Sequence, residues 1–396
     1  MISKAMEPLI HNNSAVRAMF EEGKQMAAKY GAENVYDFSL GNPNLHPPKE
    51  VKQAILDILD TEDPHRVHGY MSNAGFETTR QAVAENLNKR YGSHYTMENI
   101  IMVVGAASGL NILLKTILDP DDEVIVFAPF FVEYRNYVSN YYARTVVVPP
   151  SPETGFLPRM DAFEERITPK TKAVIINTPN NPTGAIYPAE TLKAIGEVLD
   201  RKSKEIGHPI YLISDEPYRE LVYTDQEVPF VPDYYTNTLI GYSFSKSLSL
   251  PGERIGYVVI PSESDNAKEF IEAATIANRV SGSVNAPSLM QLVIERCLDA
   301  QVDVPYYKKN AEDLYRIVTE AGFQCVRPQG AFYLWVASPV ADEKEFVQAG
   351  KEEHLIMVPG SSFAGPGNVR LSFCVSNDMI LRSEPAFRAL GKKYFG

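Results

Sequence analysis

Short apolar runs separated by helical stretches are the feature that most limits the fold of this 396-residue chain. Runs of four or five mostly apolar residues recur at 100–104, 123–127, 145–148, 173–176, 209–213, 239–242 and 257–260. After the first run, Leu110, Leu113, Leu114 and Ile117 recur at helical spacing. Continuous apolar strands joined by helices are typical of a mostly parallel sheet that is covered on both faces. The sequence therefore predicts an α/β fold.

Polar and aromatic side chains follow the ends of these runs. They are Phe131, Asn181, Asp215, Tyr218, Ser243 and Lys246. In open α/β sheets, ligands bind beyond the carboxyl ends of the strands. Because scattered surface residues have no reason to gather at one edge of a sheet, the pattern predicts a single site there.

Lys246 is the centre of this candidate site, in the segment YSFSKSLSLPGERIGY at 242–257. Burial at the end of a strand and a nearby cation lower the pKa of a lysine, so that a neutral amine becomes available. Such an amine forms a Schiff base with a carbonyl compound. Ser243, Ser245 and Arg254 suit a phosphate group beside it. The alternative is a solvated lysine in a serine-rich loop.

A small-residue turn at 105–109, GAASG, joins the first apolar run to a helix. The free N–H groups at the start of that helix, at Ala106 and Ala107, suit a phosphate. The turn is neither a Walker loop nor GxGxxG. A close-packed strand–helix turn explains it equally well.

Four further positions each have two interpretations. Asp215 closes an apolar strand and needs a partner, either a protonated ring nitrogen or the next helix. Arg370 lies within an apolar strand and needs an anion, either from this chain or from a substrate. Gly41 either lets the backbone come close to a bound group or forms a simple turn. Tyr70 is either a site residue or an aromatic side chain that packs against its neighbours.

The net charge of −12 argues against nucleic acid or an anionic membrane as the main partner. Cys297, Cys325 and Cys374 show neither metal-ligand spacing nor a disulfide framework. The N-terminus lacks the apolar core of a signal peptide, and no apolar run is long enough for a membrane span. We therefore expect a cytoplasmic protein without a metal site.

Taken together, four motifs resemble those of class I pyridoxal-phosphate-dependent aminotransferases of fold type I. They are Asn181-Pro-x-Gly, Asp215-x-x-Tyr218, Ser243-x-x-Lys246 with Arg254 eight residues on, and Val369-Arg370-Leu371-Ser372. The resemblance runs from about Gly41 to Phe373, and the segment DFSLGNPN resembles prokaryotic aspartate aminotransferases. It implies a three-layer α/β/α large domain with a smaller α+β domain. The expected division is an N-terminal arm at 1–45, a large cofactor domain at 46–285 and a small domain at 286–396.

The resemblance also implies catalytic roles at the cofactor ring. Lys246 would hold the cofactor as an internal aldimine and then move the proton at the substrate α-carbon. Asp215 would keep the pyridinium nitrogen protonated. Asn181 and Tyr218 would hydrogen-bond the phenolate oxygen of the ring.

Phosphate and substrate positions follow from the same resemblance. The phosphate would lie between Arg254, Ser243, Ser245 and the backbone of Ala106 and Ala107. Arg370 would bind the substrate α-carboxylate beside Gly41 and Asn181, and Phe131 would stack on the ring. Tyr70 would reach the phosphate of a neighbouring subunit, which implies a homodimer with shared active sites.

The expected reaction is ping-pong transamination from an L-amino acid, with aspartate as the best candidate, to 2-oxoglutarate. Arg279 lies near where some relatives bind a distal carboxylate, but it reads equally well as a solvated helix-end arginine. Tyr70, Phe131 and Phe332 leave an aromatic or broad-specificity enzyme as an alternative. A carbon–sulfur lyase on the same fold is a further alternative, because fold alone does not fix the reaction.

Overall fold

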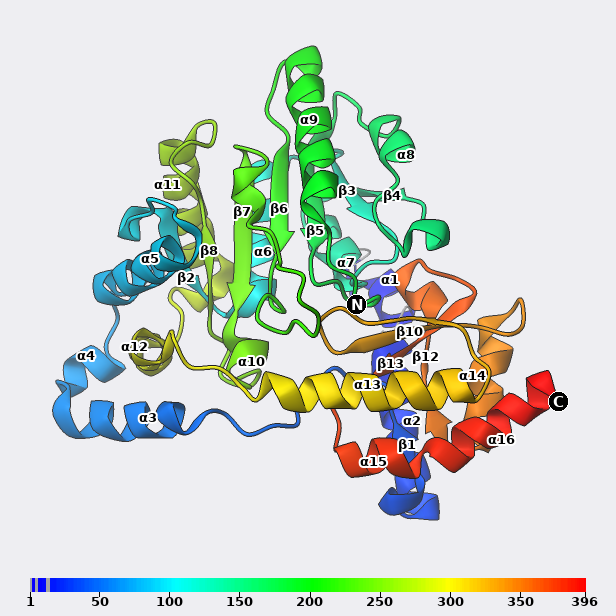
Figure 1. Cartoon of the computed structure of the whole chain (residues 1–396). Helices are drawn as coiled ribbons and strands as arrows, with labels where there is room; N and C mark the ends of the chain where they lie inside the picture. Colours follow the sequence, from blue (N-terminus) through cyan, green and yellow to red (C-terminus); the bar gives the residue numbers. More distant parts are fainter. Residues whose placement is uncertain (1, 4–5, 12–14) are drawn as a thin grey trace.

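A seven-stranded sheet forms the centre of the computed structural model, which describes residues 2–3, 6–11 and 15–396 (Figure 1). Its strand order is β2-β8-β7-β6-β5-β3-β4. The strands are β2 Ile100–Val103, β3 Glu123–Phe127, β4 Arg144–Val148, β5 Thr171–Asn177, β6 Tyr211–Asp215, β7 Thr238–Ser243 and β8 Gly256–Val259. Only β8 runs antiparallel to its neighbours. The predicted mostly parallel sheet is confirmed.

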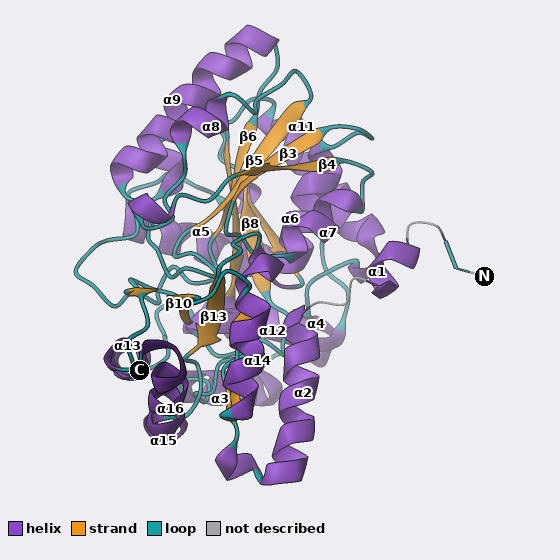
Figure 2. Cartoon of the chain, turned by 90° about the vertical axis from the view of Figure 1, so that its right-hand side faces the viewer, coloured by secondary structure: helices purple, strands orange, loops and turns teal. Residues whose placement is uncertain are grey.

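Both faces of this sheet are apolar, because successive side chains of a strand point to opposite sides. On β2, Ile100 and Met102 pack in one cluster, whereas Ile101 and Val103 pack in another. Helices α6 Gly105–Ile117, α7 Glu133–Ser139 and α11 Ala267–Asn278 cover one face. Helices α5 Glu77–Tyr91, α8 Met160–Glu164, α9 Ala189–Ile206 and α12 Ser288–Cys297 cover the other (Figure 2). The sheet with these helices is called the large unit below.

Short elements complete the connections around the large unit. They are α3 Lys49–Thr61, α4 Pro64–His68, η2 Met97–Asn99, η3 Pro152–Thr154, η4 Val231–Asp233, α10 Phe244–Ser247 and η5 Arg279–Ser283. Two further elements lie near the start of the chain: α1 Glu7–His11, and η1 Ala32–Asn34, which joins two elements of the small unit described next. Within the described residues, no helix combines the length and apolarity that crossing a membrane would require.

The second unit is built on a four-stranded antiparallel sheet with the order β12-β13-β10-β9. Its strands are β9 Cys325–Val326, β10 Tyr333–Ala337, β12 Val358–Pro359 and β13 Asn368–Ser372. A parallel pair, β1 Tyr36–Asp37 with β11 Leu355–Ile356, lies beside it. Its helices are α2 Ala15–Tyr30, α13 Val304–Glu320, α14 Glu343–Glu352, η6 Gly360–Phe363, α15 Asn377–Arg382 and α16 Glu384–Phe395. These elements are called the small unit.

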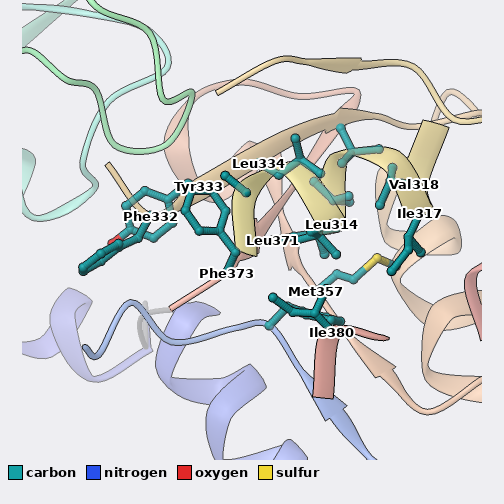
Figure 3. Packing of buried hydrophobic residues seen from close by; sticks show 14 of the residues in the cluster. Leu314, Ile317, Val318, Phe332, Tyr333, Leu334, Met357, Leu371, Phe373 and Ile380 are labelled. Atoms are coloured by element: carbon teal, nitrogen blue, oxygen red, sulfur yellow. The ribbon is translucent and has the colours of Figure 1, made fainter. Parts of the chain in front are cut away.

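The core of the small unit forms where α13 lies on the antiparallel sheet. Leu314 and Ile317 of α13 face Leu334 of β10 and Leu371 of β13 (Figure 3). All four side chains are fully buried, so burial of apolar surface stabilises the unit.

One detail differs from what the sequence predicts. The mostly apolar segment at 354–358 predicts one strand, but it divides into β11 and β12, which pair with β1 and β13 respectively. The apolar spacing also predicts a helix from Asn13 to Tyr30 with Ser14 as its N-cap; the structure has α2 in this segment, and Asn13 and Ser14 lie outside the described part of the chain.

Candidate active site

The carboxyl ends of β5, β6 and β7 lie side by side and point toward the small unit (Figure 1). Register sets Asn177 of β5 opposite Asp215 of β6, and Asp215 opposite Gly241 of β7. A cavity of about 760 Å³ opens at this edge. It is lined by predicted site residues Gly41, Ala106, Ala107, Phe131, Asn181, Asp215, Tyr218, Ser243, Ser245, Lys246, Arg254 and Arg370.

Lys246 lies in α10, the single turn that begins directly after β7. Its Nζ donates a hydrogen bond to the Gly41 carbonyl oxygen at 2.7 Å. Burial lowers the pKa of Lys246 to about 8, and the positive charges of Arg370 and Arg254 act in the same direction. A substantial fraction of this amine is therefore neutral near physiological pH, as a nucleophile requires.

Asp215 presents one satisfied and one unsatisfied carboxylate oxygen. Its Oδ2 accepts a hydrogen bond from the Tyr134 hydroxyl at 2.6 Å, whereas its buried Oδ1 has no partner among the described residues. Burial raises the pKa of Asp215 to about 7, and the Tyr134 hydrogen bond opposes this rise. An orphaned carboxylate oxygen aimed into a cavity fits a cationic N–H donor from a bound group.

Several hydrogen-bond donors that suit a phosphate line the cavity. The Ser243 and Ser245 hydroxyls are 2.6 Å apart, and Arg254 Nη1 donates to the Pro251 carbonyl oxygen at 2.9 Å. The first turn of α6 adds the N–H groups of Ala106 and Ala107, which have no intrahelical acceptors. Together, these donors form an anion site at a helix N-terminus.

Gly105 makes the close approach between α6 and Arg254 possible. Its φ of +74° lies in the left-handed region, and a Cβ at this position would collide with the Arg254 guanidinium. The glycine thus keeps the arginine next to the helix N-terminus.

Arg370 extends from β13 of the small unit into the same cavity. Its Nη1 donates to Asn181 Oδ1 at 3.1 Å, and its Nη2 donates to the Ser39 carbonyl oxygen at 2.6 Å. The guanidinium lies over the rings of Tyr333 and Phe363, at 4.4 and 4.6 Å from their centroids. Its Nε has no partner, and no described carboxylate forms an ion pair with it. The sequence left open whether its anion came from this chain; no such carboxylate is found among the described residues.

Tyr218 and Tyr333 share a hydrogen bond between their hydroxyl oxygens at 2.9 Å. Burial raises the pKa of Tyr218 well above its usual value, so this phenol stays neutral. Tyr333 also fills the space beside Gly41, where a Cβ would clash with its hydroxyl. The Gly41 backbone can therefore lie close to both Lys246 and Tyr333.

Sequence reasoning missed Tyr134 and Tyr333. Tyr134 lies one helical turn after Phe131, and their rings meet edge to face at 5.6 Å. Nothing in the spacing links Tyr134 to Asp215. Tyr333 lies within the apolar run at 331–336, and only the fold brings its hydroxyl to Tyr218.

Three residues considered for the site lie outside the cavity. Tyr70 has 92% of its surface exposed, Arg279 is also exposed, and Phe332 is fully buried in the small unit. The proposed action of Tyr70 on a neighbouring subunit stays a prediction.

The family model described as aminotransferase class I and II matches residues 33–382 of the chain. The chain belongs to this family. The solved structure of an aminotransferase from Eubacterium rectale is 46% identical, with a TM-score of 0.97 over 100% of both chains. An aspartate aminotransferase from Pyrococcus horikoshii is 30% identical over 95% of this chain and 94% of its own length. An aspartate/prephenate aminotransferase from Thermus thermophilus is 33% identical over 89% and 90%.

Class I and II aminotransferases use pyridoxal phosphate, and the cavity fits this cofactor. The orphaned Oδ1 of Asp215 suits a protonated ring nitrogen. The Ser243 and Ser245 hydroxyls, the Arg254 guanidinium and the N-terminus of α6, which line the same cavity, suit the phosphate. Lys246 supplies the amine for the cofactor's carbonyl carbon. The chain is a pyridoxal-phosphate-dependent aminotransferase.

Proposed function

We propose that this aminotransferase transfers the amino group of L-aspartate to 2-oxoglutarate by a ping-pong mechanism. One observation carries the proposal: Arg370 is a buried guanidinium with a free Nε and no carboxylate partner among the described residues, in the same cavity as Lys246. A 2-amino acid needs a cation to bind its carboxylate and a nucleophilic amine near its α-carbon. The unpaired guanidinium of Arg370 and the amine of Lys246 meet these two needs. The names of the Pyrococcus and Thermus relatives support aspartate as the amino donor.

The bound cofactor supplies an electron-accepting ring and an aldehyde carbon. Lys246 holds the cofactor and then moves a proton at the substrate α-carbon. Asp215 keeps the ring nitrogen protonated through its free Oδ1, while the Tyr134 hydrogen bond favours the ionised form of the carboxyl. Asn181 and Tyr218 donate hydrogen bonds to the ring oxygen.

Phosphate and substrate are held by the remaining cavity residues. The phosphate is bound by Arg254, Ser243, Ser245 and the backbone of Ala106 and Ala107. Phe131 stacks on the ring, and Arg370 binds the substrate α-carboxylate with Asn181 and Gly41 beside it.

The assembly is part of the same proposal. We propose a cytoplasmic homodimer in which the exposed Tyr70 reaches the partner's phosphate. We also propose that the small unit closes over the substrate and expels water. The division at 45/46 and 285/286 stays a prediction; α12 shares its core with α3 and α5, which favours a last boundary after Cys297.

The test is the visible spectrum of the purified protein while single L-amino acids are added without a 2-oxo acid. Loss of the cofactor's visible band with aspartate and glutamate, and its return with 2-oxoglutarate, is expected. A band that responds only to tyrosine or phenylalanine would replace the proposal with an aromatic aminotransferase. A band that responds to no amino acid would contradict transamination altogether.

A further inference from the structure

The cavity contains a cation that the proposed reaction does not use. The described cationic residues that line it are Arg17, Lys24, Lys246, Arg254 and Arg370. The last three have roles above. Lys24 forms an ion pair with Glu21 at 3.4 Å and lies over the Phe20 ring. Within residues 2–3, 6–11 and 15–396, no ion pair or hydrogen bond engages the Arg17 side chain.

Arg17 is held at the cavity by α2. Val16, Arg17, Phe20, Glu21 and Lys24 line the cavity at helical spacing, so one face of α2 covers it. Val16 packs against the cluster that contains Trp335 and Phe363, and Phe363 lies directly under the Arg370 guanidinium. Arg17 therefore follows a residue fixed to the same cluster that supports Arg370.

The rest of α2 is anchored to the small unit. Glu22 pairs with Lys351 of α14 at 2.7 Å, and the Tyr30 ring stacks on His354 at 4.5 Å. The helix that carries Arg17 and the strand that carries Arg370 therefore belong to one packed unit.

The charges around Arg17 leave it available to a ligand. Of the anionic side chains that line the cavity, Glu21 pairs with Lys24, Glu133 accepts a hydrogen bond from Asn136 at 2.7 Å, and Asp215 is bonded to Tyr134. Two other positions supply no competing cation. Ala107, on the large-unit side of the cavity, is uncharged, and Arg279 lies outside the cavity of its own chain.

We propose that Arg17 binds the side-chain carboxylate of the substrate and so sets a preference for dicarboxylic amino acids over uncharged ones. The inference rests on the proposed function and deepens it. Arg370 takes the α-carboxylate, and Arg17 takes the distal carboxylate through charge-assisted hydrogen bonds. Because Arg17 is exposed, its interaction is partly screened and weakens with added salt.

The test compares dicarboxylate and monocarboxylate binding to the cofactor-loaded enzyme. Dissociation constants of succinate and butyrate are measured by calorimetry for wild type and Arg17→Gln. Loss of a hydrogen bond to a charged group predicts succinate binding weakened by about tenfold or more, with butyrate unchanged. The kcat/KM for L-aspartate relative to L-2-aminobutyrate should fall by a similar factor.

Three matched variants make the result specific. Lys29→Gln removes the same charge from α2 away from the cavity and should change neither constant. If Lys24→Gln or Arg279→Gln, rather than Arg17→Gln, selectively weakens succinate, the assignment to Arg17 is overturned. Equal weakening of succinate and butyrate in Arg17→Gln also overturns it, since that result indicates a general effect on the cavity.

Failure of the inference and failure of the proposed function look different. A wild-type enzyme that prefers aspartate, with an unchanged preference in Arg17→Gln, overturns only the role of Arg17. A wild-type enzyme that does not use aspartate and binds succinate no better than butyrate overturns both.

Discussion

At the scale of single residues, the site shifts the pKa values of two ionisable groups away from their ordinary values in water. Burial raises the pKa of Asp215 and lowers the pKa of Lys246, so each group is shifted toward its neutral form in the protein without cofactor. Groups displaced in this way are typical of catalytic sites, and each displacement predicts a measurable pH dependence.

Asp215 should make the cofactor-free protein less stable as pH rises from about 4 to about 7. Its folded pKa of about 7 lies above the ordinary value of 3.8, so the folded state keeps a proton that the unfolded state has lost. The group's stabilising effect is therefore complete below pH 3.8 and is lost as pH rises through 7. The full effect is on the order of 4 kcal/mol. The free energy of unfolding, measured with denaturant across this pH range, should fall less steeply for Asp215→Asn than for wild type. Equal slopes for the two proteins would contradict the prediction.

Tyr134→Phe should raise the pKa of Asp215 further, because it removes the hydrogen bond that stabilises the carboxylate. At pH 7 a smaller fraction of Asp215 is then ionised to hold a protonated ring nitrogen. We expect cofactor affinity to fall by about tenfold and its pH midpoint to move upward, as measured by fluorescence titration of the apoprotein. Tyr137→Phe, which lines the cavity without a bond to Asp215, is the control.

Lys246 should react faster as pH rises through about 8, because only its neutral amine is nucleophilic. The rate at which the apoprotein gains visible absorbance with added pyridoxal phosphate should follow this midpoint. A midpoint near 10.5, the ordinary value for lysine, would mean that burial does not act on this amine.

At the scale of elements, the turns after the strands hold the site in place. Glu216 and Arg219 follow Asp215 and form a buried ion pair, with the arginine held near the rings of Tyr91 and Phe230. The pair fixes the turn that carries both Asp215 and Tyr218.

Glu216→Gln should destabilise the fold by about 3–5 kcal/mol, because it leaves a buried guanidinium without its counter-charge. Thermal or denaturant unfolding measures the loss. Glu164→Gln, which disrupts the exposed pair with Arg201, should cost about 1 kcal/mol or less. Similar losses of stability in the two variants would show that burial does not make the Glu216–Arg219 pair more important than an exposed pair.

Gly105→Ala and Gly92→Ala separate backbone strain from contact with Arg254. Both glycines have φ near +70°, but only at Gly105 does a Cβ meet the guanidinium. Each variant should lose about 1 kcal/mol or more of stability through strain. Only Gly105→Ala should also weaken inorganic phosphate binding to the apoprotein, measured by calorimetry.

At the scale of the whole molecule, the sheet was predictable because its strands are continuous apolar runs, such as 123–127 for β3. The motif residues gathered as expected, since parallel strand ends share one edge. Arg17, Tyr134 and Tyr333 were not predictable as site residues, because their neighbours come from distant parts of the chain. The division of 354–358 was missed for the same reason: its two halves have partners far away in sequence.

The pairing of β1 with β11 has a consequence for synthesis on the ribosome. Tyr36 leaves the ribosome long before its partner Leu355 is made. The strands of the large sheet, at 100–259, are complete well before then. β1 therefore stays without its partner strand until β11 has been synthesised. We expect protease sensitivity of a nascent chain around residue 36 to persist until the segment around residue 355 has left the exit tunnel.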